Sequence, residues 1–331
     1  MQHQRPKIGD VARLAGVSTA TVSRVLSNPQ IVSAETRGLV EEAISQTGYR
    51  LNQAARNLRH RRTGGIVALV PNLSNSFFSQ ILSGIASVLA PAGYNLLVAD
   101  TRAEGGNSIL RYAEPSRADG LIVLDGSLPP EGLGRRMPVV LACEWIPGFV
   151  APRVKIDNRA AAIMAVEHLI GLGHSRIAHV AGPPGNVLTI ARQAGAEQAL
   201  ASHGLPSAHL FTGDFSLASG QRAGAQWLAL PQAERPTAVF LASDEMACGF
   251  IGEVQHHGVM VPRDVSIIGF DDIELVAHMT PALSTIRQPR EALGRHAAQR
   301  LLDRIGGDDR VDDTVLPVEL VLRGSTAVLS S

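Results

Sequence analysis

The chain has 331 residues, of which 45% are hydrophobic and 18% charged, an ordinary globular composition whose length predicts two or three domains. No stretch of about 18 apolar residues occurs, which excludes a transmembrane helix, and the opening lacks the apolar core of a secretory signal. We therefore expect a cytoplasmic protein that makes no membrane contact.

The sequence also argues against an enzyme. Its two cysteines, Cys143 and Cys248, are too few and too far apart for a disulfide framework or a CxxC zinc site. No Walker A loop, HExxH or GxSxG motif occurs, and neither Lys7 nor Lys155 follows a phosphate-binding loop. We expect no catalytic residues, no metal ligands and no cofactor.

The net charge of zero hides an asymmetry. Residues 1–62 hold ten basic and four acidic side chains, a net charge of +6, and the rest of the chain carries −6. A basic block ahead of an acidic body indicates a separate domain that binds a polyanion. A merely solvated basic face is the alternative, and the pattern within the block must decide.

Three short helices are predicted in this block. Residues 8–15 place apolar side chains on one helical face, and Gly16 then breaks the pattern. Ser18 can cap a second helix over 19–26, which Asn28-Pro29 ends, and a third helix runs over 33–48. Two helices joined by a tight turn and braced by a third are typical of a helix-turn-helix.

In a helix-turn-helix the start of the second helix reaches base edges in the major groove. Arg24 can form two hydrogen bonds to guanine, which gives about 1–3 kcal/mol of base discrimination. A purely structural three-helix bundle is the alternative, and the exposed polar surface of the second helix argues against it. The expected base and phosphate contacts are Ser18, Thr19, Ala20, Thr21, Ser23 and Arg24.

A further short helix is expected over 52–58, capped by Asn52. Isolated helices under about 12–15 residues are marginal in water, so this segment needs DNA or its twin in a dimer as a partner. Its apolar side chains include Ala55 and Leu58, and Leu58 could enter the minor groove and kink the duplex. A plain basic linker is the alternative. The DNA-binding headpiece would thus span residues 6–62.

From residue 63 onward apolar strands alternate with helices. This order predicts an α/β core of parallel sheets covered on both faces, and about 265 residues predict two lobes over 63–331. Strands are expected at 66–70, 95–99, 120–124, 138–142, 154–156, 176–181, 210–211, 237–242, 265–268 and 316–322, and helices at 77–89, 160–172, 190–203, 219–230, 245–257 and 290–305.

Ligands in such sheets bind beyond the carboxyl ends of the strands. Aromatic rings, carboxylates and an arginine gather at these positions, a combination that suits a sugar or a nucleoside. Each residue also has a structural alternative, because strand-end aspartates often cap helices and Phe77 and Phe78 could be core. The candidate effector-binding residues are Phe77, Phe78, Glu144, Arg192, Phe215, Asp244 and Asp271.

The segment D-V-A-R-L-A-G-V-S-T-A-T-V-S-R-V-L at 10–26 closely resembles the headpiece of LacI/GalR-family repressors. The resemblance extends over essentially the whole chain, through residues 32–37, 48–49, 75–78, 156–158, 173–177, 243–247, 266–272, 281–286 and 322–326. It implies a helix-turn-helix headpiece joined to a two-lobed core like a periplasmic binding protein. It also implies a homodimer or tetramer on double-stranded operator DNA, with Leu58 on a hinge helix in the minor groove.

Segments 142–144, 213–215 and 323–326 look most like the cytidine- and purine-repressor branch, which implies an effector that bears a ribose, a nucleobase or both. Three departures stand out: the usual proline that opens the hinge helix is absent, Asn186 and Leu188 replace purine-contacting residues, and Ala196 replaces an aromatic. The chain ends without a leucine-heptad extension, which favours a dimer. A hexose- or pentose-responsive regulator of the same family is the alternative, and a free small-molecule-binding protein a remote one.

Overall fold

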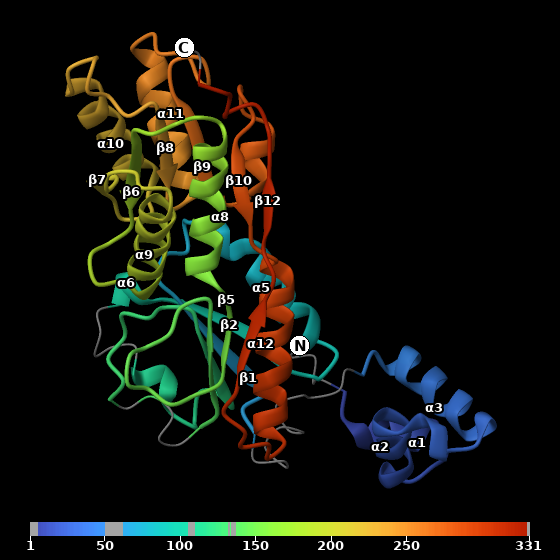
Figure 1. Ribbon diagram of the computed structural model, residues 1–331. Coiled ribbons are helices and arrows are strands. Elements are labelled where there is room, and N and C mark those ends of the chain that lie inside the picture. The colour runs from blue at the N-terminus through green and yellow to red at the C-terminus, as the bar shows by residue number, and fades with distance from the viewer. Residues whose placement is uncertain (1–5, 50–61, 105–109, 132, 134–136, 330–331) are drawn as a thin grey trace. The chain divides into compact units, whose positions relative to one another are not determined.

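The computed structural model describes residues 6–49, 62–104, 110–131, 133 and 137–329. The chain divides into two compact units, Met1–Arg62 and Thr63–Ser331, which we call the headpiece and the core (Figure 1).

The headpiece contains the three predicted helices, α1 (Ile8–Leu14), α2 (Thr19–Ser27) and α3 (Ala34–Thr47), with a 3-10 turn η1 (Pro29–Ile31) after α2. Gly16, with φ +66°, makes the turn between α1 and α2 that a residue with a Cβ would adopt only with strain. Ser18 and Ser33 cap the next two helices by accepting bonds from Thr21 N (3.1 Å) and Thr36 N (3.3 Å). The core of this unit is apolar: Val11, Ala12, Ala15, Val22, Val25, Val40 and Ala43.

The first lobe of the core has a six-stranded parallel sheet in the order β11-β5-β4-β3-β1-β2. All residues of β1 are buried, as expected for a strand covered on both faces. The strands are β1 (Gly65–Val70), β2 (Asn95–Asp100), β3 (Gly120–Val123), β4 (Val139–Ala142), β5 (Arg153–Ile156) and β11 (Asp313–Leu316).

The second lobe has a sheet in the order β12-β10-β9-β8-β6-β7, parallel except for β12, which pairs antiparallel with β10. An antiparallel edge strand on an otherwise parallel sheet is common in such folds. The strands are β6 (Ile177–Ala181), β7 (His209–Thr212), β8 (Ala238–Leu241), β9 (Ser266–Asp271), β10 (Ser284–Arg287) and β12 (Glu319–Val321).

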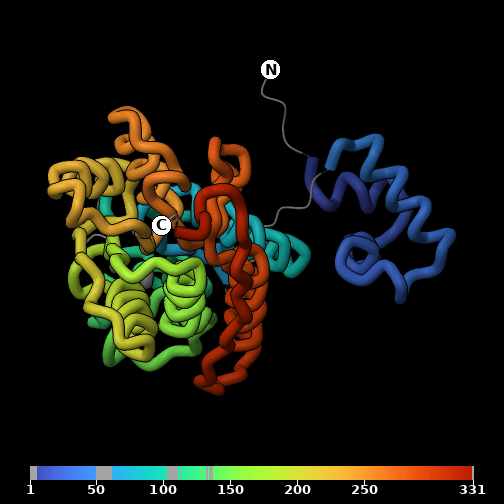
Figure 2. Tube along the Cα trace, turned by 45° about the horizontal axis from the view of Figure 1, so that its top comes forward, coloured from blue at the N-terminus to red at the C-terminus, as the bar shows by residue number. Residues whose placement is uncertain are grey.

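Helices pack in pairs on these sheets. In the first lobe α5 (Phe77–Leu89) packs against α12 (Arg290–Ile305), and α12 also contacts β3, β4 and β5. In the second lobe α8 (Asn158–Gly171) pairs with α9 (Val187–Ser202), side by side in Figures 1 and 2, and α10 (Leu217–Ala229) pairs with α11 (Asp244–His256). The short helical segments are α6 (Thr101–Glu104), η2 (Leu110–Ala113) and η3 (Glu274–Ala277).

The chain passes between the lobes three times: after β5, between β10 and α12, and between β11 and β12. The predicted strand over 316–322 is therefore wrong as a single element. Pro317 lacks a backbone N–H for a sheet, so β11 ends at Leu316 in one lobe and β12 begins at Glu319 in the other. Strand β10 was not predicted, because its four residues S-T-I-R form no apolar run.

Candidate functional site

A cavity of about 430 Å³ lies between the two lobes, where the carboxyl ends of strands from both sheets meet. Six of the seven predicted effector residues line it: Phe77, Phe78, Glu144, Arg192, Phe215 and Asp271. Other polar residues and a cysteine also line it: Asn72, Asn75, Arg102, Asp125, Ser127, Cys143, Asn186 and Asp214.

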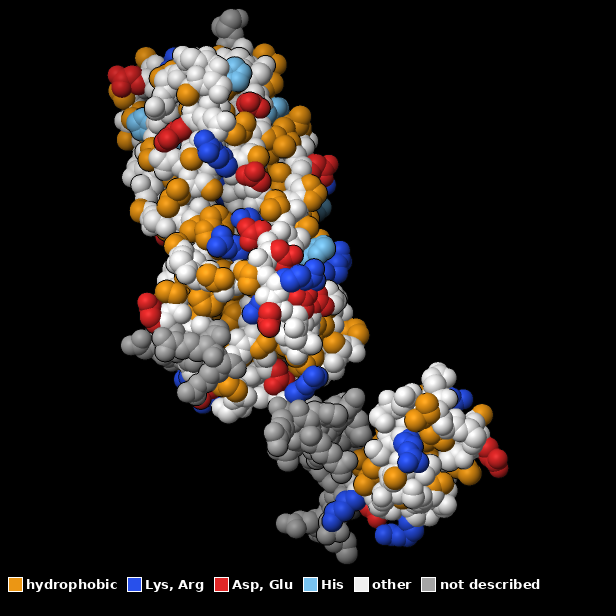
Figure 3. Space-filling model, turned by 60° about the horizontal axis from the view of Figure 1, so that its bottom comes forward, with side chains coloured by type: hydrophobic (Ala, Val, Ile, Leu, Met, Phe, Trp, Pro, Cys, Tyr) orange, Lys and Arg blue, Asp and Glu red, His pale blue; other side chains and the backbone are white. Residues whose placement is uncertain are grey.

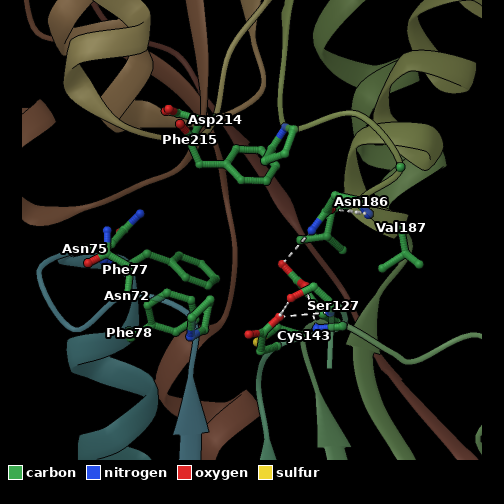
Figure 4. A pocket seen from close by; sticks show the side chains of 18 of the residues that line it. Asn72, Asn75, Phe77, Phe78, Ser127, Cys143, Asn186, Val187, Asp214 and Phe215 are labelled. Atoms are coloured by element: carbon green, nitrogen blue, oxygen red, sulfur yellow. Dashed lines mark hydrogen bonds between the residues drawn. The ribbon is translucent and has the colours of Figure 1, made fainter. Parts of the chain in front are cut away.

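One side of the cavity is aromatic (Figure 4). Phe77 and Phe78 begin α5, and their rings meet edge to face with centroids 5.1 Å apart. Phe215, which follows β7 in the second lobe, lies above these two rings in the view of Figure 4. Flat rings on this side can pack against the face of a sugar or a base.

The opposite side is polar, and the two lobes contact each other there. Glu144, from the end of β4, accepts hydrogen bonds from Gly126 N (2.8 Å) and from Asn186 Nδ2 (3.1 Å), which belongs to the other lobe. Burial raises the pKa of the Glu144 carboxyl, while these two bonds lower it. Asp125 lies beside it and accepts bonds from Ser127 N (2.9 Å) and Oγ (2.6 Å).

The sequence could have indicated Asp125, because it directly follows the predicted strand 120–124, as the proposed candidates follow theirs. The resemblance places Asn186 at a ligand-contacting position, but its bond to the other lobe is harder to predict. Its side-chain oxygen caps α9 by accepting a bond from Leu188 N (2.8 Å), and its amide nitrogen is thereby aimed at the other lobe.

Arg192 is 2% exposed and lies on α9, where protein atoms already engage much of its guanidinium. Its Nε donates to Asn158 Oδ1 (2.9 Å), its Nη1 donates to Ala242 O, and its Cζ lies 3.7 Å from the ring centroid of Phe270. Burial lowers the pKa of Arg192, and the neighbouring Asp271 and Glu144 oppose that shift.

Asp271 ends β9, and Gln288 Nε2 donates to its Oδ1 (2.7 Å). Its φ of +121° is one of four positive values at described non-glycine residues; Cys143 (+66°) and Phe215 (+63°) also line the cavity, and Asp272 (+55°) follows directly. Strained backbone of this kind clusters where a site must be preorganised. The strain therefore supports the cavity as a binding site.

The prediction for Asp244 has to be corrected, because this residue is not part of the cavity lining. It is fully buried; its Oδ1 accepts a bond from Thr285 Oγ1 (2.7 Å) and its Oδ2 one from Ile273 N (3.0 Å). Burial raises the pKa of Asp244 well above its usual value. Its oxygens tie α11 to the segments after β9 and in β10, so an effector contact from Asp244 is wrong.

The predicted DNA-contacting residues of α2 are accessible. Ser18, Thr19, Ala20 and Arg24 are exposed, and Thr21 and Ser23 are partly exposed. Figure 3 shows basic side chains spread over the visible face of the headpiece. Asn52, Ala55, Leu58 and the predicted hinge helix 52–58 lie outside the residues that the structure describes.

Comparison with known proteins identifies the family. Residues 7–52 match the lacI family of bacterial regulatory proteins, and residues 166–326 match a periplasmic binding protein-like domain. The chain is 39% identical over 329 residues to the HTH-type transcriptional repressor CytR of Escherichia coli K12, covering 97% of this chain and 96% of that one. It belongs to the LacI family.

Solved structures agree with this assignment. The lac repressor dimer bound to operator and the anti-inducer ONPF superposes with a TM-score of 0.84 at 29% identity, over 98% of this chain and 100% of that one. A LacI-family regulator from Enterococcus faecium with bound ribose superposes with a TM-score of 0.74 at 28% identity, over 80% of this chain and 100% of that one.

The predicted fold, a helix-turn-helix headpiece with a two-lobed core of mainly parallel sheets, is confirmed, and this LacI-family chain is a DNA-binding transcription regulator. Among the described residues, no helix is both long enough and apolar enough to cross a membrane.

Replacing Asp271 by asparagine is expected to change how stability depends on pH. Burial raises the pKa of Asp271 to about 6, so between about pH 4 and 6 the folded chain holds a proton that the unfolded chain releases. Its contribution to the free energy of unfolding therefore falls as pH rises through this window. Asparagine stays uncharged, so the variant should gain stability relative to wild type as pH rises.

Urea unfolding of both proteins between pH 4.5 and 7 tests this, and only the difference between them is informative. The buried His179, whose pKa is lowered to about 4, acts in the opposite direction in both chains, because folding disfavours its protonation. Parallel pH profiles for wild type and Asp271→Asn would show that Asp271 does not titrate in this range.

Proposed function

We propose that this protein is a homodimeric repressor whose headpiece binds operator DNA through residues 6–62 and whose core, residues 63–331, dimerises and binds a nucleoside, nucleobase or pentose. The cavity between the lobes is the single observation that carries the effector half, because it combines aromatic rings and buried carboxylates at the strand ends. A DNA-binding regulator of this kind acts in the cytoplasm.

At the DNA end, we assign base contacts to Thr19, Ala20 and Arg24, whose side chains lie at the exposed start of α2. Ser18, Thr21 and Ser23 would bond phosphates. The hinge contacts assigned to Asn52, Ala55 and Leu58 rest on the sequence alone. Dimerisation brings two headpieces to two half-sites, which raises the effective concentration of the second one.

At the effector end, we assign contacts to Phe77, Phe78, Glu144, Arg192, Phe215 and Asp271. The described lining holds four carboxylates, from Asp125, Glu144, Asp214 and Asp271, against the guanidiniums of Arg102 and Arg192. An excess of acceptors favours an uncharged ligand rich in hydroxyl or amino donors and disfavours a phosphate group. This supports a nucleoside, nucleobase or pentose over a nucleotide, with a hexose as the second candidate.

The test is an operator-binding titration with candidate effectors. A fluorescent fragment from upstream of the protein's own gene is titrated with full-length protein, alone and with cytidine, adenosine, cytosine, D-ribose or cytidine monophosphate. We expect binding that an uncharged nucleoside or ribose weakens and the monophosphate does not, and, by linkage, an equal weakening of effector binding by DNA. Binding that none of these compounds changes would refute the effector class.

Arg24→Ala is expected to reduce the preference for operator over random DNA by about fivefold or more, because a bidentate arginine–guanine contact gives roughly 1–3 kcal/mol of discrimination. The measurement is competition between the two DNAs at fixed salt. Arg13→Ala is the matched control, since Arg13 lies on α1, pairs with Asp10 (3.3 Å) and carries the same charge. An unchanged preference in Arg24→Ala would remove the base-reading role.

A further inference from the structure

The start of α5 in the first lobe has an unusual cap. Ser76, just before the helix, makes no capping bond with its own side chain. Instead its backbone N and its Oγ donate to Oε1 of Glu245, at 3.1 and 3.4 Å. Glu245 lies in the first turn of α11 in the second lobe, so a carboxylate from one lobe caps a helix of the other.

We propose that Glu245 is a positioning residue that latches the two lobes together outside the effector cavity and so sets effector affinity. Neither Ser76 nor Glu245 lines the cavity. The proposal rests on the proposed effector function only for its consequence for affinity; the latch itself is a property of the core.

The physical basis is the free end of a helix. The first backbone N–H groups of a helix have no partner within it, and a carboxylate there both accepts a bond and lies at the positive end of the helix dipole. Glu245 is half-buried, which raises the pKa of its carboxyl while the bonds from Ser76 lower it. Partial burial also makes such a charge-assisted bond stronger than one in water.

A second contact lies one turn further along α5. Gln80 Nε2 donates to Oε1 of Glu274, on η3 of the second lobe. Glu274 is 59% exposed and also lies 3.7 Å from Arg290 Nη2. Solvent-exposed contacts of this kind contribute little, so we assign the larger share to Glu245.

The latch acts on the segment that carries Phe77 and Phe78, two of the aromatic residues of the cavity. Phe77 and Phe78 follow Ser76 directly and line the cavity, and Phe77 N donates to Asn75 Oδ1 (2.8 Å). Holding the start of α5 against α11 therefore fixes the distance of Phe77 and Phe78 from the second lobe. The bond between the lobes from Asn186 to Glu144, by contrast, lies within the cavity, where a ligand would compete with it.

Without the bond from Ser76 to Glu245, the free protein should less often hold its two lobes in the arrangement described here. Apparent affinity falls in proportion to the population of the binding-competent state. Loss of the charge-assisted bond to Ser76 should therefore raise Kd about five- to tenfold in Glu245→Ala. Glu245→Gln keeps an oxygen for Ser76 N and should restore most of the affinity.

The experiment compares full-length wild type, Glu245→Ala, Glu245→Gln and Glu253→Ala. Glu253 is the matched control, since it lies on the same helix and its carboxylate contacts Gln221 (3.0 Å) and His257 (3.6 Å), both of the second lobe. Hydrogen–deuterium exchange without ligand is followed in peptides covering 72–82 and 183–190, which lie on opposite sides of the cavity. Calorimetric titration with cytidine and with D-ribose follows on each variant.

We expect Glu245→Ala to speed exchange in both peptides and raise Kd, and Glu253→Ala to match wild type. Faster exchange in 72–82 alone would reduce Glu245 to a local helix cap, and wild-type exchange in both peptides would overturn the latch outright. If wild type binds neither cytidine nor D-ribose, the proposed effectors are wrong for these two compounds, and the exchange data alone decide for or against the latch.

Discussion

Arg192→Ala is expected to lower the free energy of unfolding of the core by about 3–5 kcal/mol and to abolish effector binding. Arg192 is the buried cation beside Asp271 and Glu144, and removing one member of a buried charge group leaves the others uncompensated. The substitution also removes two hydrogen bonds, to Asn158 and Ala242 O, and the contact with Phe270. These losses act on the pocket and on the second lobe together.

Both tryptophans, Trp145 and Trp227, belong to the core, so their fluorescence in urea follows its unfolding without a signal from the headpiece. Arg192→Lys keeps the charge but not the planar fork, and should lie between wild type and alanine. Gln193→Ala is the control on the same helix, because Gln193 is partly exposed and its side-chain amide donates to Glu197, also on α9 (2.9 Å). An Arg192→Ala protein with wild-type unfolding and effector titration would contradict the assignment of Arg192.

Gly249→Ala is expected to destabilise the core by more than about 4 kcal/mol, whereas Gly252→Ala, three residues later on α11, should stabilise it by about 0.5–1 kcal/mol. A Cβ on Gly249 would lie 2.0 Å from Leu217 O and 2.8 Å from Gln221 N, both backbone atoms of α10. The backbone of α10 can make room for this Cβ only if α10 and α11 move apart. A Cβ on Gly252 meets no atom within 4 Å, so that change only reduces the freedom of the unfolded chain.

Comparing Gly249→Ala with Gly252→Ala tests whether α10 and α11 pack as closely as in the structure. Gly220 makes the reciprocal contact, because its Cβ would lie 1.9 Å from Met246 O. The measurement is again urea unfolding by tryptophan fluorescence, with operator binding as a check that the headpiece still folds. Equal stability of the two alanine variants would show that the helices are further apart than this contact requires.

The headpiece could be predicted well because its signals are local. Helix faces repeat every three to four residues, and Ser18 and Ser33 cap helices that begin at the next residue. The effector candidates could be predicted for a different reason. Parallel strands bring their carboxyl ends to one edge of a sheet, so residues that follow strands converge wherever they lie in the chain.

The sequence by itself therefore determined the helix-turn-helix, the alternating core and six of the residues that line the pocket, since each follows from short-range pattern or a general rule of sheet topology. Only the tertiary structure decided that Asp244 points into the packing behind the site, that Pro317 divides two strands between two sheets, and that Glu245 caps a helix 169 residues earlier in the chain. Such contacts depend on how distant segments meet, and no periodicity along the chain records that.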